Sequence, residues 1–280
     1  MRLSRVSVLA AAVFATAAPA ALADTTTSSN WAGYAVHRSG NSFRTVSGTW
    51  RQPTAKCTPG VPTYSAFWVG LGGYSFNAPA LEQTGTEVDC SLSGKVVSTA
   101  WYELVPAAST PVKLRVNPGD LMRASVTVLG TKVVIALDDV TRHRGFHKML
   151  NAQAVDISSA EWIAEAPSQC VSLDSCTTLP LADFASASFD SATAQSIAGH
   201  TGGIVDPQWR WTKITLTPGG RRFAAYQGSG PAAGAATPTS VLGDGRSFAV
   251  NWALASTQGV PDLIRRTAIR SAGSLVHPVR

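Results

Sequence analysis

Short apolar or alternating runs, separated by glycine, proline and serine, recur along this chain. In the clearest case, residues 122–128 alternate apolar and polar side chains and residues 133–137 resume the pattern after Gly130 and Thr131. Such a pair predicts a hairpin, with Gly130 supplying positive φ at the first central turn position. The strands expected from these patterns are 31–36, 43–50, 64–71, 78–84, 96–104, 112–116, 121–129, 132–138, 160–164, 184–189, 209–216, 223–227 and 248–253. Strands in this number, about ten residues apart, predict an all-β antiparallel sandwich.

Two stretches depart from this pattern. Residues 191–198 and 260–272 are predicted to be helical, and the low-complexity run 228–238 is interpreted as a long surface loop. We expect residues 24–280 to form a single β-sandwich domain that includes the part after about residue 200, because the strand after the loop is too short to make a second domain. Two small domains are the alternative for this length.

Residues 1–23 have the pattern of a secretory signal peptide. Arg2 and Arg5 precede an apolar run at 6–18, and Ala21-Leu22-Ala23 matches a small-x-small cleavage site. The apolar run is too short to span a bilayer stably, so we expect cleavage after Ala23 and secretion, with no membrane attachment. Subtracting the two arginines from 23 basic residues leaves 21 against 17 acidic ones, a net charge of +4. These charges are dispersed, which argues against a nucleic-acid partner.

The four cysteines of an exported chain predict two disulfides. Of the three possible pairings, we favour Cys170 with Cys176, which closes a short polar loop and leaves Cys57 with Cys90. A zinc site is the weaker alternative, because the sequence has neither C-x-x-C spacing nor a nearby histidine pair.

Several catalytic chemistries are disfavoured by the motifs. Gly-x-Ser-x-Gly does not occur, and the only triplet resembling the Asp-Thr-Gly turn of pepsin-like enzymes has an amide, Gln83, in place of the acid. His143 and His147 are four residues apart, but on a strand this spacing is about 13 Å, too far for one metal ion. We therefore expect neither a metal nor another cofactor.

Glutamate placement is more informative, since the only glutamates are Glu82, Glu87, Glu103, Glu161 and Glu165. A carboxyl group among aromatic and branched side chains loses hydration, which raises its pKa toward the range useful for acid–base chemistry. The amide of Gln83 and the carboxylate of Glu165 could together hydrolyse a peptide bond, one holding the oxyanion and the other taking a proton from water. The alternative is that both are ordinary polar residues on a half-buried sheet.

Five sequence blocks, in order, resemble the glutamic endopeptidases, the eqolisin family of secreted acid proteases. They are Ser29-Asn30-Trp31-Ala32-Gly33, Phe67-Trp68-Val69-Gly70, Leu81-Glu82-Gln83-Thr84-Gly85, Ala100-Trp101-Tyr102-Glu103 with Pro106, and Ala160-Glu161-Trp162-Ile163-Ala164-Glu165. The loop between Cys170 and Cys176, with Phe184-Ala185-Ser186 after it, is also similar, and the likeness fades beyond Gly199.

The resemblance implies a lectin-like (concanavalin-like) sandwich of two bent sheets with its active groups on the concave face. It implies Gln83 and Glu165 as the catalytic pair, acting without metal or covalent intermediate on polypeptide substrates. The resemblance also implies that Trp68 and Trp31 bind substrate and that Glu103 is a supporting polar group. We expect a monomer.

The chain also departs from the fungal members of that family. Gly72 stands where they often have an acidic residue, the net charge is basic, and only four residues separate the expected cleavage site from Ser28, leaving no room for a long propeptide. The rival functions are a glycan-binding module using Trp31, Trp68, Trp101 and Trp162, a glycoside hydrolase using Glu103 and Glu165, and a catalytically silent homologue.

Overall fold

The computed structural model describes residues 23–40, 42–75, 77–172, 175–220 and 234–255 of the 280-residue chain, and every regular element in these ranges is a β-strand. No helix in the described ranges is long and apolar enough to cross a membrane. The strands are β1 Ala23–Ser28, β2 Trp31–His37, β3 Phe43–Arg51, β4 Ala66–Gly72, β5 Leu81–Cys90, β6 Val96–Val105, β7 Thr110–Pro111, β8 Leu121–Leu129, β9 Lys132–Asp139, β10 Arg144–Asn151, β11 Ser159–Glu165, β12 Ser168–Ser172, β13 Ser175–Thr178, β14 Ser186–Ser196, β15 Thr201–Gly202, β16 Arg210–Leu216, β17 Gly234–Pro238 and β18 Phe248–Leu254.

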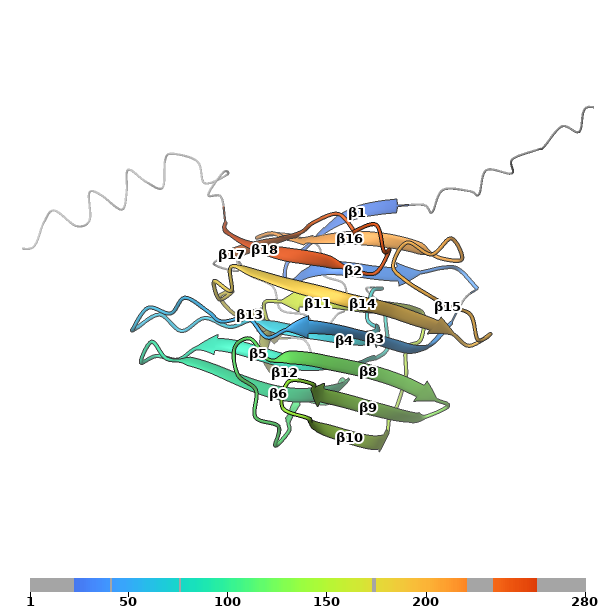
Figure 1. Ribbon diagram of the computed structural model, residues 1–280, viewed down its shortest axis with the longest axis horizontal. Helices are drawn as coiled ribbons and strands as arrows, with labels where there is room; N and C mark the ends of the chain where they lie inside the picture. Colours follow the sequence, from blue (N-terminus) through green and yellow to red (C-terminus); the bar gives the residue numbers. More distant parts are fainter. Residues whose placement is uncertain (1–22, 41, 76, 173–174, 221–233, 256–280) are drawn as a thin grey trace, which may run out of the picture.

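One long sheet folds back on itself to make both layers of the sandwich (Figure 1). Its order is β10-β9-β8-β3-β14-β18-β17-β16-β2-β11-β4-β5-β6-β7, with β15 beside β14 and β1 beside β16. The pairings are antiparallel except for β1, which runs parallel to β16. Strands β3, β8 and β9 pack across β4, β5 and β11, which confirms the predicted all-β sandwich.

The core between the layers follows from the alternation seen in the sequence. In β8, Met122, Ala124, Val126 and Val128 are buried in the core, as are Val133, Ile135 and Leu137 of β9. Gly130, at the turn between them, has φ of 66°, so the predicted hairpin is confirmed.

A second apolar cluster covers the opposite face of the β2-β11-β4-β5-β6 half of the sheet. We call this surface, which points away from the core, the site face. Successive side chains of β11 point alternately to the core and to the second cluster: Trp162 belongs to the core, while Ile163 belongs to the second cluster. The buried members of that cluster are Trp31, Ala35, Ala66, Trp68, Leu81, Trp101, Val105, Ile163 and Ile214, with Tyr74 packed against them.

Several local predictions were wrong. Residues 191–198, expected to be helical, lie mostly in β14, where Ala192, Ala194 and Ser196 alternate inward. Residues 112–116 are not a strand, and β17 forms a buried part of the sheet where a loop was expected. Strand β5 begins at Leu81 rather than at residue 78. The predictions for 223–227 and 260–272 lie outside the described residues.

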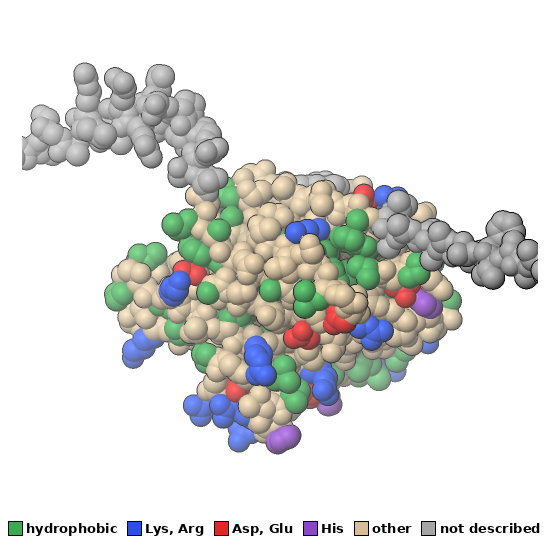
Figure 2. Space-filling model, turned by 45° about the horizontal axis from the view of Figure 1, so that its top comes forward, with side chains coloured by type: hydrophobic (Ala, Val, Ile, Leu, Met, Phe, Trp, Pro, Cys, Tyr) green, Lys and Arg blue, Asp and Glu red, His purple; other side chains and the backbone are tan. Residues whose placement is uncertain are grey.

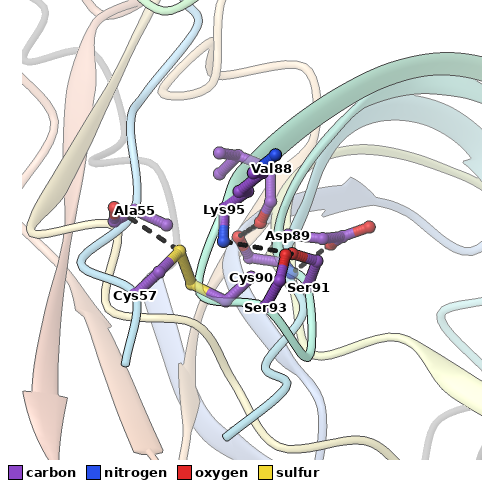
Figure 3. The surroundings of a disulfide bond; sticks show 9 residues. Ala55, Cys57, Val88, Asp89, Cys90, Ser91, Ser93 and Lys95 are labelled. Atoms are coloured by element: carbon purple, nitrogen blue, oxygen red, sulfur yellow. Dashed lines mark hydrogen bonds between the residues drawn. A yellow bond between two sulfur atoms is a disulfide. The ribbon is translucent and has the colours of Figure 1, made fainter. Parts of the chain in front are cut away.

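Cys57 and Cys90 form the disulfide that the preferred pairing requires, with their Cα atoms 5.2 Å apart. Figure 3 shows this bond joining the segment before β4 to the end of β5. Cys176 is also disulfide-bonded, and the backbone of Cys170 lies directly opposite it in the β12–β13 hairpin. The side chain of Cys170 is outside the described part of the chain, so its pairing stays a prediction.

The N-terminal strand begins at Ala23, after which cleavage is expected; removal of residues 1–23 would leave Asp24–Ser28 paired with β16. Residues 1–22 lie outside the described ranges. On the face shown in Figure 2, basic and acidic side chains are interspersed, in keeping with the dispersed charge of the sequence.

Candidate active site

Gln83 and Glu165 project from the same face of the sheet, on strands that both border β4. Gln83 of β5 lies opposite Gly70, and Glu165 of β11 lies opposite Ala66. Residues an even number apart on one strand share a face, so Ala66 and Gly70 orient both partners toward the site face. The register therefore places on one face of the sheet two side chains that are 82 positions apart in the sequence.

The indole of Trp68 occupies the β4 position between them. Its Nε1 donates a hydrogen bond of 2.7 Å to Glu165 Oε2. A Cβ atom added at Gly70 would lie 2.9 Å from the Trp68 ring and 3.2 Å from Cβ of Gln83, so the ring edge passes over Gly70 beside Gln83. A Cβ atom at Gly85 would lie 2.6 Å from Cβ of Trp68. The two glycines thus make the space in which this indole lies.

Glu165 accepts hydrogen bonds with both carboxylate oxygens. In addition to Trp68, the Asn30 amide Nδ2 donates to Oε1 at 2.8 Å. Burial raises the pKa of Glu165 to about 8, and the nearby Glu103 raises it as well, while the bonds from Trp68, Trp31 and Asn30 lower it. These donors favour the ionised form and low hydration favours the protonated one, so this group can both take up and release a proton near neutral pH.

Asn30 was not assigned a role from the sequence, although it lies in the first quoted block. Its position is fixed by Ser28, whose hydroxyl donates to Asn30 Oδ1 and accepts from the backbone N–H groups of Asn30 and Trp31. The carbonyl of Asn30 also accepts from Ala166 N–H. The loop between β1 and β2 is thereby held against the end of β11, with the amide directed at Glu165.

The side chain of Gln83 is held by Glu103. The amide Nε2 donates to Glu103 Oε2 at 2.6 Å, and the two residues lie opposite each other in the β5–β6 register. Burial raises the pKa of Glu103 to about 7, the bond from Gln83 lowers it and the charge of Glu87 raises it. One amide hydrogen of Gln83 is thus engaged and the other remains for a ligand.

The four tryptophans singled out in the sequence do not lie on one face of the sheet. The ring centroids of Trp31 and Trp68 are 5.0 Å apart in edge-to-face contact, and both side chains are buried in the cluster beside Glu165. Trp162, included in the glycan-binding alternative, instead faces the core and donates from Nε1 to the carbonyl of Ser47. The four tryptophans therefore do not form one exposed platform for sugar.

No group of three or more histidine, cysteine, aspartate or glutamate residues in the described ranges could hold a metal ion. His147 lies on β10 with its Nε2 2.7 Å from Asp138, and His143 lies in the turn before it. The site face offers an amide, carboxyl groups and indole N–H groups. This set is suited to proton transfer and to stabilising an oxyanion.

Comparison with solved structures defines the class to which the fold belongs. Scytalido-glutamic peptidase in complex with a peptide-based transition-state analogue matches with a TM-score of 0.62 and 22% identity, over 80% of this chain and 98% of that one. The structure of SCP-B, a member of the eqolisin family, in complex with the tripeptide Ala-Ile-His matches with a TM-score of 0.59 and 22% identity, over the same shares. The fold is therefore the eqolisin β-sandwich.

The family model of the peptidase A4 family matches residues 29–217, more than half of the chain. The chain belongs to this family, the eqolisins, and is a glutamic-class peptidase. A search of curated protein sequences finds no match. The match ends at residue 217, so β17 and β18, which lie between β16 and β14 in the sheet, are outside it.

Proposed function

We propose that this peptidase is an endopeptidase that hydrolyses polypeptides with Gln83 and Glu165 as its catalytic residues. The observation that carries the proposal is the shared face: the amide and the carboxylate project from one surface of the sheet, each held by a separate acidic or indole partner. Family membership supports the reaction class, and the resemblance of the sequence blocks together with the shared face supports the choice of residues.

In the proposed mechanism, ionised Glu165 takes a proton from a water molecule that attacks the scissile carbonyl. The second amide hydrogen of Gln83 bonds to the developing oxyanion, while Glu103 holds the first. Glu165 then returns the proton to the leaving amine, so no covalent enzyme intermediate is formed. Trp68 and Asn30 keep the carboxylate in one orientation through both transfers.

The raised pKa of Glu165, about 8 in the free protein, restricts the pH range of this chemistry. At strongly acidic pH the carboxyl group holds a proton and cannot act as a base. We therefore expect activity in the weakly acidic range, about pH 5 to 7, where part of the enzyme has ionised Glu165 and the leaving amine still needs a proton.

We further propose that the mature protein is exported and acts outside the cell, on the pattern of residues 1–23. Mass spectrometry of the culture supernatant tests this directly: an intact mature form beginning at Asp24 would support it, and retention of Met1 on cell-associated protein would contradict it.

The activity test uses denatured casein from pH 2 to 8, with pepstatin, a chelator and a serine-protease inhibitor present in separate reactions. Cleavage in all three, lost in E165Q while the variant keeps the thermal unfolding transition of the wild type, supports the proposal. Cleavage abolished by one inhibitor, or preserved in E165Q, would overturn it. A parallel assay with soluble polysaccharides tests the glycosidase and glycan-binding alternatives.

A further inference from the structure

Strand β10 is an uncovered edge of the long sheet. It stands at one end of the strand order and pairs only with β9, over all eight of its residues and without a register shift. Figure 1 shows it along the lower border of the molecule. Six of its eight residues are exposed, and within the described ranges no main-chain hydrogen bond joins its outer side to another segment. An edge of this kind offers its main-chain groups to a further strand.

The hydrogen bonds around β9 show which main-chain groups of β10 point outward. In an antiparallel pair, successive residues alternately bond to the neighbouring strand and point away from it. Ala152 N–H, directly after β10, donates to the carbonyl of Thr131. On the other side of β9, Val140 N–H donates to the carbonyl of Leu121, which gives the same alternation. The β10 residues whose N–H and C=O groups point away from β9 are therefore Gly145, His147, Met149 and Asn151.

Three cations of the β9–β10 hairpin have no acidic partner in the part of the chain that the structure describes. Lys132 of β9 and Arg144 and Lys148 of β10 are exposed, and none of them takes part in an ion pair. The two acids of the hairpin are already engaged, one by His147 and the other by Arg142. The edge therefore carries positive charge that nothing beside it neutralises.

Contacts with the other layer of the sandwich hold β10 in place. The Phe146 ring stacks on Tyr102 of β6 with centroids 5.8 Å apart. Lys148 Nζ lies 5.5 Å from the centroid of the same ring and donates to the Tyr102 hydroxyl at 3.4 Å. Because these contacts exist before any partner binds, an added strand meets an edge that is already ordered.

A second copy of the chain fits this edge poorly. Antiparallel self-pairing must match outward-pointing residues with one another, which leaves few registers near full overlap. These registers place Arg144 opposite Lys148, Lys148 opposite Lys148, or His147 opposite His147. Like charges directly opposite each other destabilise a strand pair, whereas opposite charges stabilise it. The charge of the edge therefore favours an acidic strand as its partner.

We propose that β10 is an exosite, which binds an extended acidic stretch of a polypeptide substrate as an additional strand of the sheet. The substrate backbone pairs with the four outward-pointing residues of β10. Its carboxylates lie opposite Arg144 and Lys148, in the non-hydrogen-bonded pairs where facing side chains are closest. The role in substrate binding rests on the proposed endopeptidase function, whereas the strand addition itself does not involve Gln83 or Glu165.

Peptide binding to the full mature chain carrying E165Q, which avoids digestion of the probe, tests the strand addition. The probe is a fluorescent decapeptide rich in threonine and valine, with glutamates at its third and seventh positions, and the control peptide has glutamines there. We expect the acidic peptide to bind about tenfold more tightly at low salt. Hydrogen–deuterium exchange in its presence should slow in β10 and stay unchanged on the site face.

Two variants of the edge separate its backbone from its charge. M149P removes one outward-pointing N–H and leaves the bonds to β9 in place, because proline is tolerated where the N–H of an edge strand faces solvent. It should weaken binding of the acidic peptide about fivefold. R144E/K148E should weaken it about tenfold or more. The matched control K95E/R246E changes the net charge equally at two exposed positions away from β10, and should bind like the parent.

Cleavage by the otherwise wild-type enzyme tests the role in substrate binding. R144E/K148E should raise KM for denatured casein, an acidic polypeptide, about tenfold, and leave kcat and the cleavage of a short peptide without acidic residues unchanged.

Undiminished binding of the acidic peptide by both M149P and R144E/K148E, or protection on the site face in place of β10, would overturn the strand addition. An unchanged KM for casein in R144E/K148E would overturn the role in substrate binding. If the wild-type enzyme cleaves neither substrate, the endopeptidase proposal fails and the binding measurements alone decide the strand addition. If M149P does not fold, R144E/K148E and the exchange pattern decide it.

Discussion

Gln83 and Glu165 project from the same face of one sheet, on the two strands that flank β4, although 82 positions separate them in the sequence. Trp68 lies between them in the register. Its indole N–H donates a hydrogen bond to Glu165, and the edge of its ring lies beside Gln83. Neither carboxylate nor amide is free to rotate, since each is held by its own partner. Preorganisation of this kind is what a water-activating site requires.

The hydrogen bond from the Trp68 indole N–H lowers the pKa of Glu165. Removing this donor should therefore raise the pKa of Glu165. W68F keeps a ring in the space over Gly70 and deletes the donor. We expect the acidic limb of kcat/KM to move to higher pH and activity at pH 5 to fall about tenfold. An unchanged acidic limb would show that the limb does not report Glu165.

Glu103 holds Gln83 and also raises the pKa of Glu165, and two substitutions separate these effects. E103Q retains an oxygen that can accept from Gln83, whereas E103A does not. Both should move the acidic limb to lower pH, since both remove the negative charge. Only E103A should also lower kcat by about tenfold or more, with little change in KM. Equal kcat losses in the two variants would contradict a positioning role for this carboxyl.

Gly70 is required by the close approach of the Trp68 ring rather than by its backbone conformation. In G70A the new methyl group would lie within 2.9 Å of the ring, which must shift and weaken its bond to Glu165. We expect a loss of kcat/KM of about tenfold, with the thermal unfolding midpoint lowered by only a few degrees. A variant of full activity would show that the position of the indole is unimportant.

The buried carboxyl groups predict a protein that is most stable in acid. Burial raises the pKa of Glu103 and Asp89 to about 7 and that of Glu82 and Glu165 to about 8. In the unfolded chain these groups titrate near pH 4, so between about pH 4 and 8 the folded state binds more protons than the unfolded state. Their contribution to stability is thus complete below about pH 4 and is lost as the pH rises through 7 and 8.

Thermal unfolding of an E165Q variant, which avoids self-digestion, measures this dependence from pH 3 to 9. We expect the midpoint to fall continuously above about pH 5. A midpoint that rises between pH 5 and 8 would contradict the assignment of buried neutral acids.

The fold was largely predictable because alternation and turn residues are local signals. Strands β8 and β9 show period-two alternation with glycine between them, and their structure follows it. Residues 191–198 were predicted to be helical because alanine and glutamine favour helices locally, whereas pairing with β3 imposes an extended conformation. Strand β10 was missed because side chains on both of its faces are largely exposed, which removes the alternation.

The site residues were predictable only where they lie in the sequence blocks that resemble the eqolisin family. Gln83, Glu103 and Glu165 lie in such blocks, and the resemblance assigned them roles. The role of Asn30 depends on the loop between β1 and β2 meeting the end of β11, and the contact of Asp156 with Gly73 depends on the β4 register. Contacts of this kind arise from long-range pairing, which no local pattern in the sequence specifies.

The most direct test of the account is a double-mutant cycle on kcat/KM for an internally quenched peptide, using Q83A, E165Q and the double variant. Because the two side chains are proposed to act on one transition state, each single substitution should reduce kcat/KM by at least about a thousandfold. The double variant should then be scarcely worse than either single one. Losses that multiply independently, or a single variant that retains activity while folded, would contradict a Gln83–Glu165 dyad.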